Sequence, residues 1–316
     1  MLKYYEIIDG QLEISDNSES LIRVYIDPDV EEKRYLIEEL GIDPHTVSSA
    51  LDSDEISRVE SEPSYTAVIY KRPIPYVDRS DYHFRVASVG FFLFESQVVL
   101  VFNGDIPVFD HSRDLSGVTD LRELLVRLLQ RSIHSFIEHI KALNQMIGEL
   151  ESKLSESMGN KYLLNLFRIE QSLVYYLSAI SSNGTLIERL RSGATKIGFS
   201  QDQVGHLDNL VIDNNQCYKQ AEIISDIMAS MMDARASVVS NNLNLLMKHL
   251  TIFSLVFLPL NLIAGMGGMS EFTALAQWLE EHLKLSVGFS YVLLTTAMIA
   301  GGFFMYKWIM KTEPDE

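Results

Sequence analysis

A stripe of polar and small side chains runs into an uncharged apolar segment in the last third of the sequence. Its members recur every three or four residues and therefore share one face of a helix. They are Asp233, Ser237, Ser240, Asn244, Met247, Leu250 or Thr251, Ser254, Leu258, Asn261 and Gly265. A polar side chain such as Asn261 inside an apolar segment normally faces a bundle interior or a water-filled path. Close helix packing and an ion pathway both fit the stripe, and its unbroken run from the acidic Asp233 favours the pathway.

The stripe leads to a glycine-rich segment that could receive a cation. Residues 265–271 read Gly-Met-Gly-Gly-Met-Ser-Glu. Glycine allows backbone carbonyls to be exposed and helices to approach closely. Rings of carbonyl and side-chain oxygens hold hard, strongly hydrated cations such as Mg2+, usually with several waters retained. A plain glycine-rich helix end remains the alternative for this segment.

The rest of the sequence carries no pattern typical of an enzyme. Cys217 is the single cysteine, which excludes an intramolecular disulfide and a thiolate cluster. No HExxH, CxxC, GxSxG or phosphate-binding Gly-Lys-Ser/Thr pattern occurs, so hydrolysis and ATP-driven pumping are not predicted, and neither is a required cofactor. His206 and His249 are candidate Zn2+ ligands, although a lone histidine is more often structural or exposed. Six acids are expected mainly on solvated helix faces: Asp52, Asp54, Glu55, Asp208, Asp213 and Asp226.

Composition narrows the possible partners. The chain has 316 residues and a formal net charge of −17, which opposes binding to nucleic acid phosphates. The acidity fits a surface that collects cations, and it equally fits a large domain that needs to remain in solution. Residues 1–6 (MLKYYE) contain no apolar run or cleavage site, so no secretion signal is predicted there.

The first part of the chain, residues 1–117, is predicted to be an α/β domain. Runs rich in Val, Phe and Tyr predict strands at Leu21–Ile26, Tyr65–Tyr70, Phe84–Phe94 and Val98–Phe102. Short helices are predicted at Val30–Leu40, which Gly41 ends, and at His45–Leu51 after Pro44.

Long helices follow, over residues 118–249. Apolar residues recur at three and four positions from about residue 120, and Met158-Gly159-Asn160 interrupts that pattern. A second helix is predicted from about 161 to 191, and a third begins near Gln201 and meets no proline before Pro259. If continuous, the third would extend roughly 90 Å, at ~1.5 Å per residue. Helices of this length need partners along their length, which predicts a bundle or stalk.

Two apolar segments close the chain, over residues 250–311. Residues 250–269 and 286–306 each approach the ~20 residues that cross a bilayer core. The intervening loop is acidic, whereas Arg235, Lys248, Lys307 and Lys311 flank the segments. The positive-inside tendency therefore predicts two transmembrane helices with a short external loop and both termini in the cytoplasm.

The segment that carries the stripe resembles a known family. Residues 240–253 (SNNLNLLMKHLTIF) look like the entry to the first membrane helix of the CorA-type divalent cation transporters, two-helix proteins with a Gly-Met-Asn signature. Residues 257–265 (FLPLNLIAG) look like its continuation, and the signature falls on Gly268-Met269-Ser270. The glycine and methionine match, serine replaces asparagine, and Gly267 stands where an aromatic residue is usual.

The resemblance extends upstream and covers nearly the whole chain. Residues 40–45 (LGIDPH), then Arg58-Val59-Glu60 and the strand at Tyr65, are similar to the family's N-terminal domain. The implied fold is an α+β cytosolic domain followed by long helices and two C-terminal transmembrane helices, assembled as a funnel-shaped homopentamer in the cell inner membrane, in contact with lipid.

The resemblance also implies a function and its residues. It implies channel-like transport of Mg2+, Co2+ and Ni2+ down the electrochemical gradient, with Mg2+ also a possible regulator. The implied pore-lining residues are Asn244, Met247, Leu250, Leu258 and Asn261. The implied outer mouth consists of Gly268, Met269, Ser270 and Glu271, with Glu280 and Glu281 attracting cations. Asp233 is the implied acidic ring or regulatory metal site.

Two departures from the family pattern keep alternatives open. A serine hydroxyl at position 270 reaches less far than an asparagine carbonyl and changes the balance of donors and acceptors. The tail, with Lys307 and Lys311 followed by Glu313-Pro314-Asp315-Glu316, is less basic than the family's usual end. One alternative is a Zn2+ or other transition-metal transporter of the same architecture. The other is a non-conducting membrane-anchored scaffold or metal sensor.

Overall fold

The chain forms two compact units in a computed structural model. Unit 1 comprises Met1–Ser230 and unit 2 comprises Met231–Glu316. The structure describes residues 1–8, 10–17, 19–75, 84–104, 117–156, 160–267, 270–283 and 286–312.

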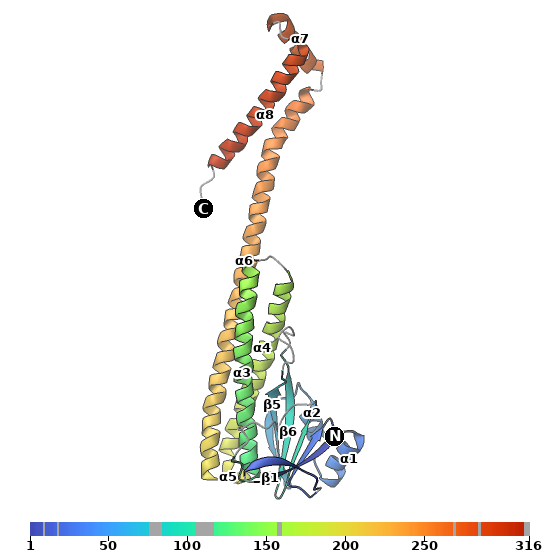
Figure 1. The fold of residues 1–316 in the computed structure, drawn as a ribbon, viewed down its shortest axis with the longest axis vertical. Coiled ribbons are helices and arrows are strands. Elements are labelled where there is room, and N and C mark those ends of the chain that lie inside the picture. The colour runs from blue at the N-terminus through green and yellow to red at the C-terminus, as the bar shows by residue number, and fades with distance from the viewer. Residues whose placement is uncertain are drawn as a thin grey trace. The chain divides into compact units, whose positions relative to one another are not determined.

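Unit 1 is built on a seven-stranded sheet whose order is β2-β1-β3-β7-β6-β5-β4 (Figure 1). The strands are β1 (Leu2–Ile8), β2 (Gln11–Ser15), β3 (Ile22–Ile26), β4 (Arg58–Ser61), β5 (Tyr65–Pro73), β6 (Val86–Phe94) and β7 (Val98–Phe102). Neighbouring strands run antiparallel except β3 and β7, which are parallel with Ile22 opposite Val98. All five residues of β7 are buried, because helices cover the sheet on both faces.

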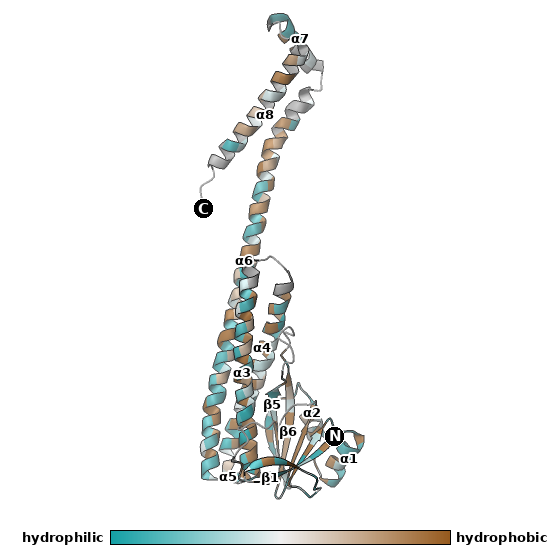
Figure 2. Ribbon diagram, viewed as in Figure 1, coloured by the Kyte–Doolittle hydropathy of each residue, from teal (hydrophilic) through white to brown (hydrophobic). Residues whose placement is uncertain are grey.

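Four of these strands confirm the sequence prediction and three were missed. β3, β5, β6 and β7 begin and end within three residues of the predicted limits. The missed strands β1, β2 and β4 lie at or near the sheet edges and contain few buried residues, so their sequences lack a strong apolar pattern. Figure 2 shows the hydrophobic character of the central strands.

One face of the sheet is covered by short helices with well-defined starts. Helix α1 (Val30–Arg34) begins in a capping box formed by Asp29 and Glu32, and helix α2 (Pro44–Leu51) is capped by Asp43. The predicted helix at Val30–Leu40 is therefore divided, since residues Tyr35–Glu39 form a π-helical turn, η1. Its Leu36 is fully buried and joins the core under this face.

Helix α2 lies unusually close to strand β6. A Cβ atom built on Gly90 would lie 2.5 Å from the Cβ of Ala50 and 3.0 Å from the ring of Phe92. Only glycine leaves room for this approach of helix to strand.

The opposite face is covered by α3 (Leu121–Glu156) and α4 (Asn160–Ser192), which both contact β5 (Figure 1). The buried side chain of Asn183 on α4 accepts a hydrogen bond from the Lys71 backbone N–H and donates one to the Lys71 carbonyl, both at 2.8 Å. Ser132 on α3 donates to the same carbonyl at 2.7 Å. One strand residue therefore fixes the register of both long helices on the sheet.

Aromatic side chains and a histidine fill the space between α3, α4 and the sheet. His139 on α3 lies with Nδ1 2.7 Å from the hydroxyl of Tyr176 on α4, and both side chains are buried. The rings of Phe84 and Phe136 contact Tyr176 edge-on. Burial, with the nearby charge of Arg72, lowers the pKa of His139 to about 4, so the imidazole is neutral in the folded chain at neutral pH.

Helix α6 (Gln201–Gly267) contributes residues to both units and is helical throughout. This confirms the prediction of a long third helix, which continues through Pro259. It follows the short helix α5 (Ala194–Ile197), and within unit 1 Asn214 on α6 donates to the carbonyl of Ile180 on α4 at 3.0 Å. Unit 2 also contains α7 (Ser270–Leu283) and α8 (Val287–Thr312).

The two predicted membrane spans fall on α6 and α8. Among the residues that the structure describes, no helix has both the length and the apolar character that crossing a membrane requires. Residues 268 and 269, at the end of the first predicted span, lie outside the described residues.

The close contact at Gly90 gives a first prediction. Gly90→Ala should lower the free energy of unfolding by about 1–3 kcal/mol, because Ala50 and α2 must move away from β6. Urea unfolding of the full-length chain measures this change. Gly148→Ala is the matched control: Gly148 is an exposed α3 residue with nothing within 4 Å of the added atom. The control should be neutral or stabilising by up to ~1 kcal/mol, and equal losses in the two variants would refute the packing argument.

His139 gives a second prediction, on pH. The unfolded chain binds a proton at this side chain below about pH 6.5, whereas the folded chain resists protonation down to about 4. The contribution of His139 to stability is therefore fully present above pH 6.5 and is lost as the pH falls toward 4. The His139→Asn variant keeps a polar partner for Tyr176 but does not titrate. When the pH falls from 7 to 4.5, the free energy of unfolding of the native chain should decrease by on the order of 2–3 kcal/mol more than that of the variant. Parallel pH profiles for the two proteins would contradict this assignment.

Candidate functional site

The predicted stripe lies entirely on the part of α6 that belongs to unit 2. The five predicted pore-lining side chains are all exposed: Asn244, Met247, Leu250, Leu258 and Asn261. Leu258 is 70% exposed and Met247 61% exposed. Asp233, the predicted acidic site, is exposed as well. A single chain thus leaves the whole stripe uncovered.

The hydroxyl groups of the stripe bond to their own helix. Ser237, Thr251 and Ser254 each donate to the carbonyl four residues earlier, at 3.1, 2.8 and 2.9 Å. A hydroxyl that donates inward keeps its oxygen lone pairs available on the outer side of the helix. These oxygens are therefore acceptors, which is the arrangement that hydration water around a cation requires.

Helix α8 packs against a different side of α6. Side chains of both helices line a small apolar pocket of about 260 Å³: Phe253, Val256, Phe257 and Leu260 from α6, with Ile299, Gly302, Phe303 and Tyr306 from α8. A Cβ built on Gly302 would lie 3.1 Å from Leu260. Residues two apart are about 200° apart around a helix, so Leu258 points away from the side on which Leu260 meets α8. The same holds for Ser254 and Val256. The stripe is therefore centred roughly 120° around α6 from the residues that face α8, so it lies on a different side of the helix.

The predicted outer mouth is only partly described. Gly268 and Met269 lie outside the described residues, while Ser270 and Glu271 are the first two residues of α7. The connection that was predicted as a short loop contains a helix, because residues 270–283 form α7. The sequence carried the signal in the three- and four-residue spacing of Leu275, Trp278 and Leu279.

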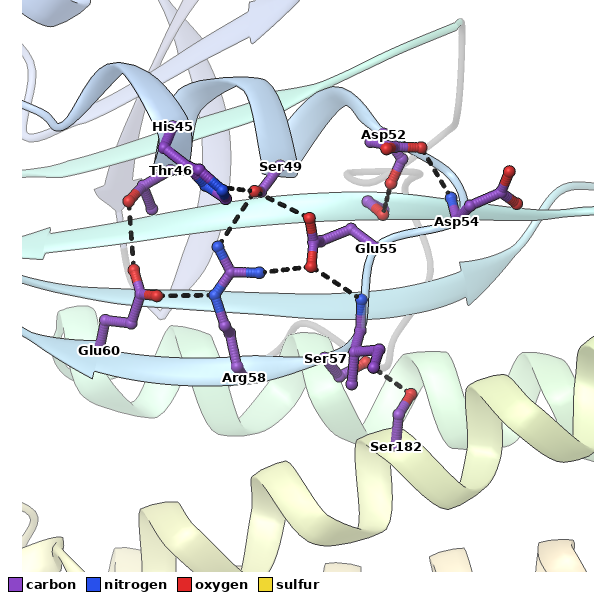
Figure 3. A network of polar contacts seen from close by, with 12 residues as sticks. His45, Thr46, Ser49, Asp52, Asp54, Glu55, Ser57, Arg58, Glu60 and Ser182 are labelled. Carbon is purple, nitrogen blue, oxygen red and sulfur yellow. Dashed lines mark hydrogen bonds and ion pairs between the residues drawn. The ribbon is translucent and has the colours of Figure 1, made fainter.

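Two acids of the sheet domain, Glu55 and Glu60, are paired with one arginine (Figure 3). Arg58 on β4 contacts Glu60 at 2.7 Å and Glu55 at 2.8 Å, and it donates to Ser49. Ser49 and Thr46 donate in turn to Glu55 and Glu60. Burial disfavours the charged form of Glu55, but the hydrogen bonds from Ser49 and the Ile56 N–H and the charge of Arg58 outweigh it, so its pKa is lowered. Glu55 and Glu60 thus already have cationic and hydrogen-bonding partners.

Lys71 was not among the residues predicted from the sequence, and it contacts the segment that carries Asp52 and Asp54. Its Nζ donates to the Ser53 carbonyl and to the Ser88 hydroxyl, both at 2.7 Å. Burial lowers the pKa of Lys71 to about 8, while Asp52, Asp54 and Glu55 partly oppose this shift. The available signal was a lysine placed directly after the apolar run YTAVIY, in the same strand.

The two histidines predicted as candidate Zn2+ ligands, His206 and His249, are not part of a metal site in the described residues. His206 Nδ1 lies 3.4 Å from Glu123, whose carboxylate also binds Arg127 at 2.8 Å. His249 is exposed on α6. Over the described ranges, no group of three or more His, Cys, Asp or Glu side chains is arranged to hold a metal ion. Metal binding by these side chains within one chain finds no support in the geometry.

The contact between α6 and α8 gives a third prediction. Gly302→Val should lower the midpoint of thermal unfolding, because its branched side chain would meet Leu260. The free energy of unfolding should decrease by about 1–3 kcal/mol. Gly301→Val is the matched control, since nothing lies within 4 Å of a Cβ at the neighbouring Gly301. Equal midpoints for the two variants would mean that α8 does not pack on α6 through Gly302.

Comparisons with known proteins agree on one family. The family model described as "CorA-like Mg2+ transporter protein" matches residues 24–310. The chain is 23% identical over 252 residues to the cobalt/magnesium transport protein CorA of Methanocaldococcus jannaschii, covering 77% of this chain and 78% of that protein. It is 24% identical over 281 residues to the protein of the same name from Thermotoga maritima, and the match covers 85% of this chain and 77% of that protein.

Solved structures share the fold. The complete structure of the CorA magnesium transporter from Methanocaldococcus jannaschii matches with a TM-score of 0.78 at 20% identity, over 99% of this chain and 97% of that one. The full-length CmaX protein matches with a TM-score of 0.71 at 12% identity, over 98% of this chain and 96% of that one. With a family model that matches nearly its whole length, this chain belongs to the CorA-like Mg2+ transporter family.

Proposed function

We propose that this protein transports divalent metal cations across the cell inner membrane through a pore lined by α6, driven by the electrochemical gradient. The observation that carries the proposal is the stripe on α6, which lies on a different side of the helix from α8 and stays exposed in one chain. Its Asn side chains and inward-donating hydroxyls offer oxygen acceptors to the water around a cation. The names of the relatives, cobalt/magnesium transport proteins, support Mg2+ and Co2+ as cargo, and Ni2+ is included in the proposal.

The pore requires several copies of the chain, because one helix cannot enclose a path. We propose a homopentamer in which the stripes of five α6 helices face a common axis. Exposed apolar side chains in unit 1 support association between copies. They are Leu164, Phe167, Val174 and Tyr175 on α4, and Ile212, Ile223 and Ile227 on α6. Apolar surface of this extent on packed helices is typical of interfaces.

The proposed path runs from an outer mouth to an acidic ring. Gly268, Met269, Ser270 and Glu271 would receive the hydrated ion, and Glu280 and Glu281, both exposed on α7, would raise the local cation concentration. The ion would then pass Asn261, Leu258, Leu250, Met247 and Asn244. Five copies of Asp233 would form the ring at the inner end, where a cation could also act as regulator.

The proposed topology follows from the distribution of charge in the sequence. The apolar residues 250–269 and 286–306 would be in contact with lipid on the faces that protein does not cover. Both termini would lie in the cytoplasm, and α7 would lie on the outer side.

Metal uptake into liposomes that contain the purified full-length protein tests the proposal. Mg2+, Co2+, Ni2+ and Zn2+ are supplied separately under an inside-negative potential. We expect uptake of Mg2+ with competition by Co2+. Uptake of Zn2+ that persists in excess Mg2+ would assign a transition-metal branch instead, and no uptake of any ion would favour a scaffold or sensor.

A matched pair of asparagines tests the stripe itself. Asn244→Leu removes an acceptor from the stripe and should lower Mg2+ uptake about tenfold or more, which corresponds to the loss of roughly 1.4 kcal/mol. Asn242→Leu makes the same change about 160° around the helix, and uptake should stay near that of the native protein. Equal loss in both variants, or no loss in Asn244→Leu, would contradict a pore on this face.

A further inference from the structure

Helix α7 has two sharply different faces. Leu275, Trp278, Leu279 and His282 follow the spacing i, i+3, i+4 and i+7, which places them on one face. Thr273, Gln277, Glu280 and Glu281 follow the spacing i, i+4, i+7 and i+8 on the other. Trp278 is 51% exposed and Leu275 45% exposed, so the apolar face is not covered by its own chain.

The apolar face is also ordered. The rings of Trp278 and His282 stack with centroids 4.5 Å apart and an interplanar angle of 21°. His282 Nδ1 lies 3.1 Å from the Trp278 carbonyl, which accepts a hydrogen bond there. The stacked indole and imidazole rings together present a broad, flat contact surface.

The connections of α7 restrict where this face can lie. Residues 268–269 link it to α6, and residues 284–286 link it to α8. With ~3.8 Å between successive Cα atoms, its two ends lie within about 15 Å of the ends of the two helices that carry the apolar segments. Helix α7 has 14 residues and is about 21 Å long, which is shorter than the ~30 Å of a hydrocarbon core.

We propose that α7 lies along the outer membrane–water interface, with the Leu275–Trp278–Leu279–His282 face in the lipid headgroup region and the Glu280–Glu281 face in water. This inference rests on the proposed function, because it requires that α6 and α8 enter the membrane. Amphipathic helices with exposed Trp and Leu typically bind at this depth, and Trp is enriched at membrane interfaces. A second copy of the chain is the other possible occupant, but the continuity of α7 with the apolar helices on both sides favours lipid.

The charge of α7 specifies the lipid. Glu280 and Glu281 are both exposed, and the described part of α7 carries no lysine or arginine. Anionic headgroups would repel this helix, whereas they attract interfacial helices that are rich in lysine and arginine. The fitting partner is a zwitterionic surface such as phosphatidylcholine.

Tryptophan fluorescence in phosphatidylcholine vesicles tests the proposal. The chain has two tryptophans, so Trp308→Phe leaves Trp278 as the only reporter and Trp278→Phe leaves Trp308. The full-length protein is reconstituted with lipid that carries a doxyl quencher at carbon 5 or carbon 12 of the acyl chain, and iodide is added to the water. We expect Trp278 to be quenched more strongly by the shallow label than by the deep one, and only weakly by iodide.

A matched pair of glutamate substitutions tests the face. Leu279→Glu places a charge in the apolar face and should shift the Trp278 emission to longer wavelength while increasing quenching by iodide. Gln277→Glu adds the same charge to the polar face and should leave the spectrum unchanged. Equal effects of the two substitutions would overturn the assignment of faces.

The remaining outcomes separate this inference from the proposed function. Quenching of Trp278 by iodide alone, with Trp308 quenched by lipid and Mg2+ uptake intact, would overturn only the placement of α7. Trp278 shielded from both iodide and lipid would assign the face to another copy of the chain and overturn the proposal. If neither tryptophan is quenched by lipid and no uptake occurs, the membrane assignment fails and this inference fails with it.

Discussion

The apolar surface of α6 in unit 2 is larger than its own chain covers. The proposed assembly and the proposed membrane location both depend on this constraint. Helix α8 covers the side of α6 that carries Val256 and Leu260, with Gly302 allowing a close approach. The remaining faces stay exposed, including Leu258 at 70% and Leu255 at 49%. Apolar area of this kind is unfavourable in water. The proposed homopentamer and its proposed contact with lipid would remove this area from water.

The position of α8 on α6 also decides how the polar residues of α6 are interpreted. A serine or threonine hydroxyl that bonds to its own helix carbonyl can be tolerated next to lipid or another helix, so Thr251 and Ser254 by themselves decide little. Asn261 is different, because an amide has more donors and acceptors than one helix can satisfy. The packing of α8 on a different side leaves the stripe free to face a shared axis.

Unit 1 has a different character, since a network of its buried polar groups is matched within one chain. Asn183 and Ser132 satisfy the backbone of Lys71, and the Lys71 ammonium holds the loop that carries Asp52 and Asp54. Arg58 engages Glu55 and Glu60 in the same region (Figure 3). Buried and semi-buried polar networks of this kind are costly to leave incomplete, so they fix the orientation of the helices on the sheet. The α4 and α6 faces that carry the exposed apolar residues are thereby presented by a well-defined scaffold.

The sequence by itself determined the elements with strong apolar periodicity and the face of α6 that carries polar residues. Strands such as Val98–Phe102 and the long helices were predictable because burial on one or two faces imposes a period on the residues. The edge strands β2 and β4 were not, because a half-exposed strand needs little apolar sequence and is defined by its neighbour. The helix at residues 270–283 could also have been predicted, because Leu275, Trp278 and Leu279 recur at three and four positions. The tertiary structure alone decided that α8 packs on a side of α6 other than the stripe, and that Lys71 is a buried junction of sheet and helices. Both features depend on contacts between residues far apart in the chain, and such contacts leave no period in the local sequence.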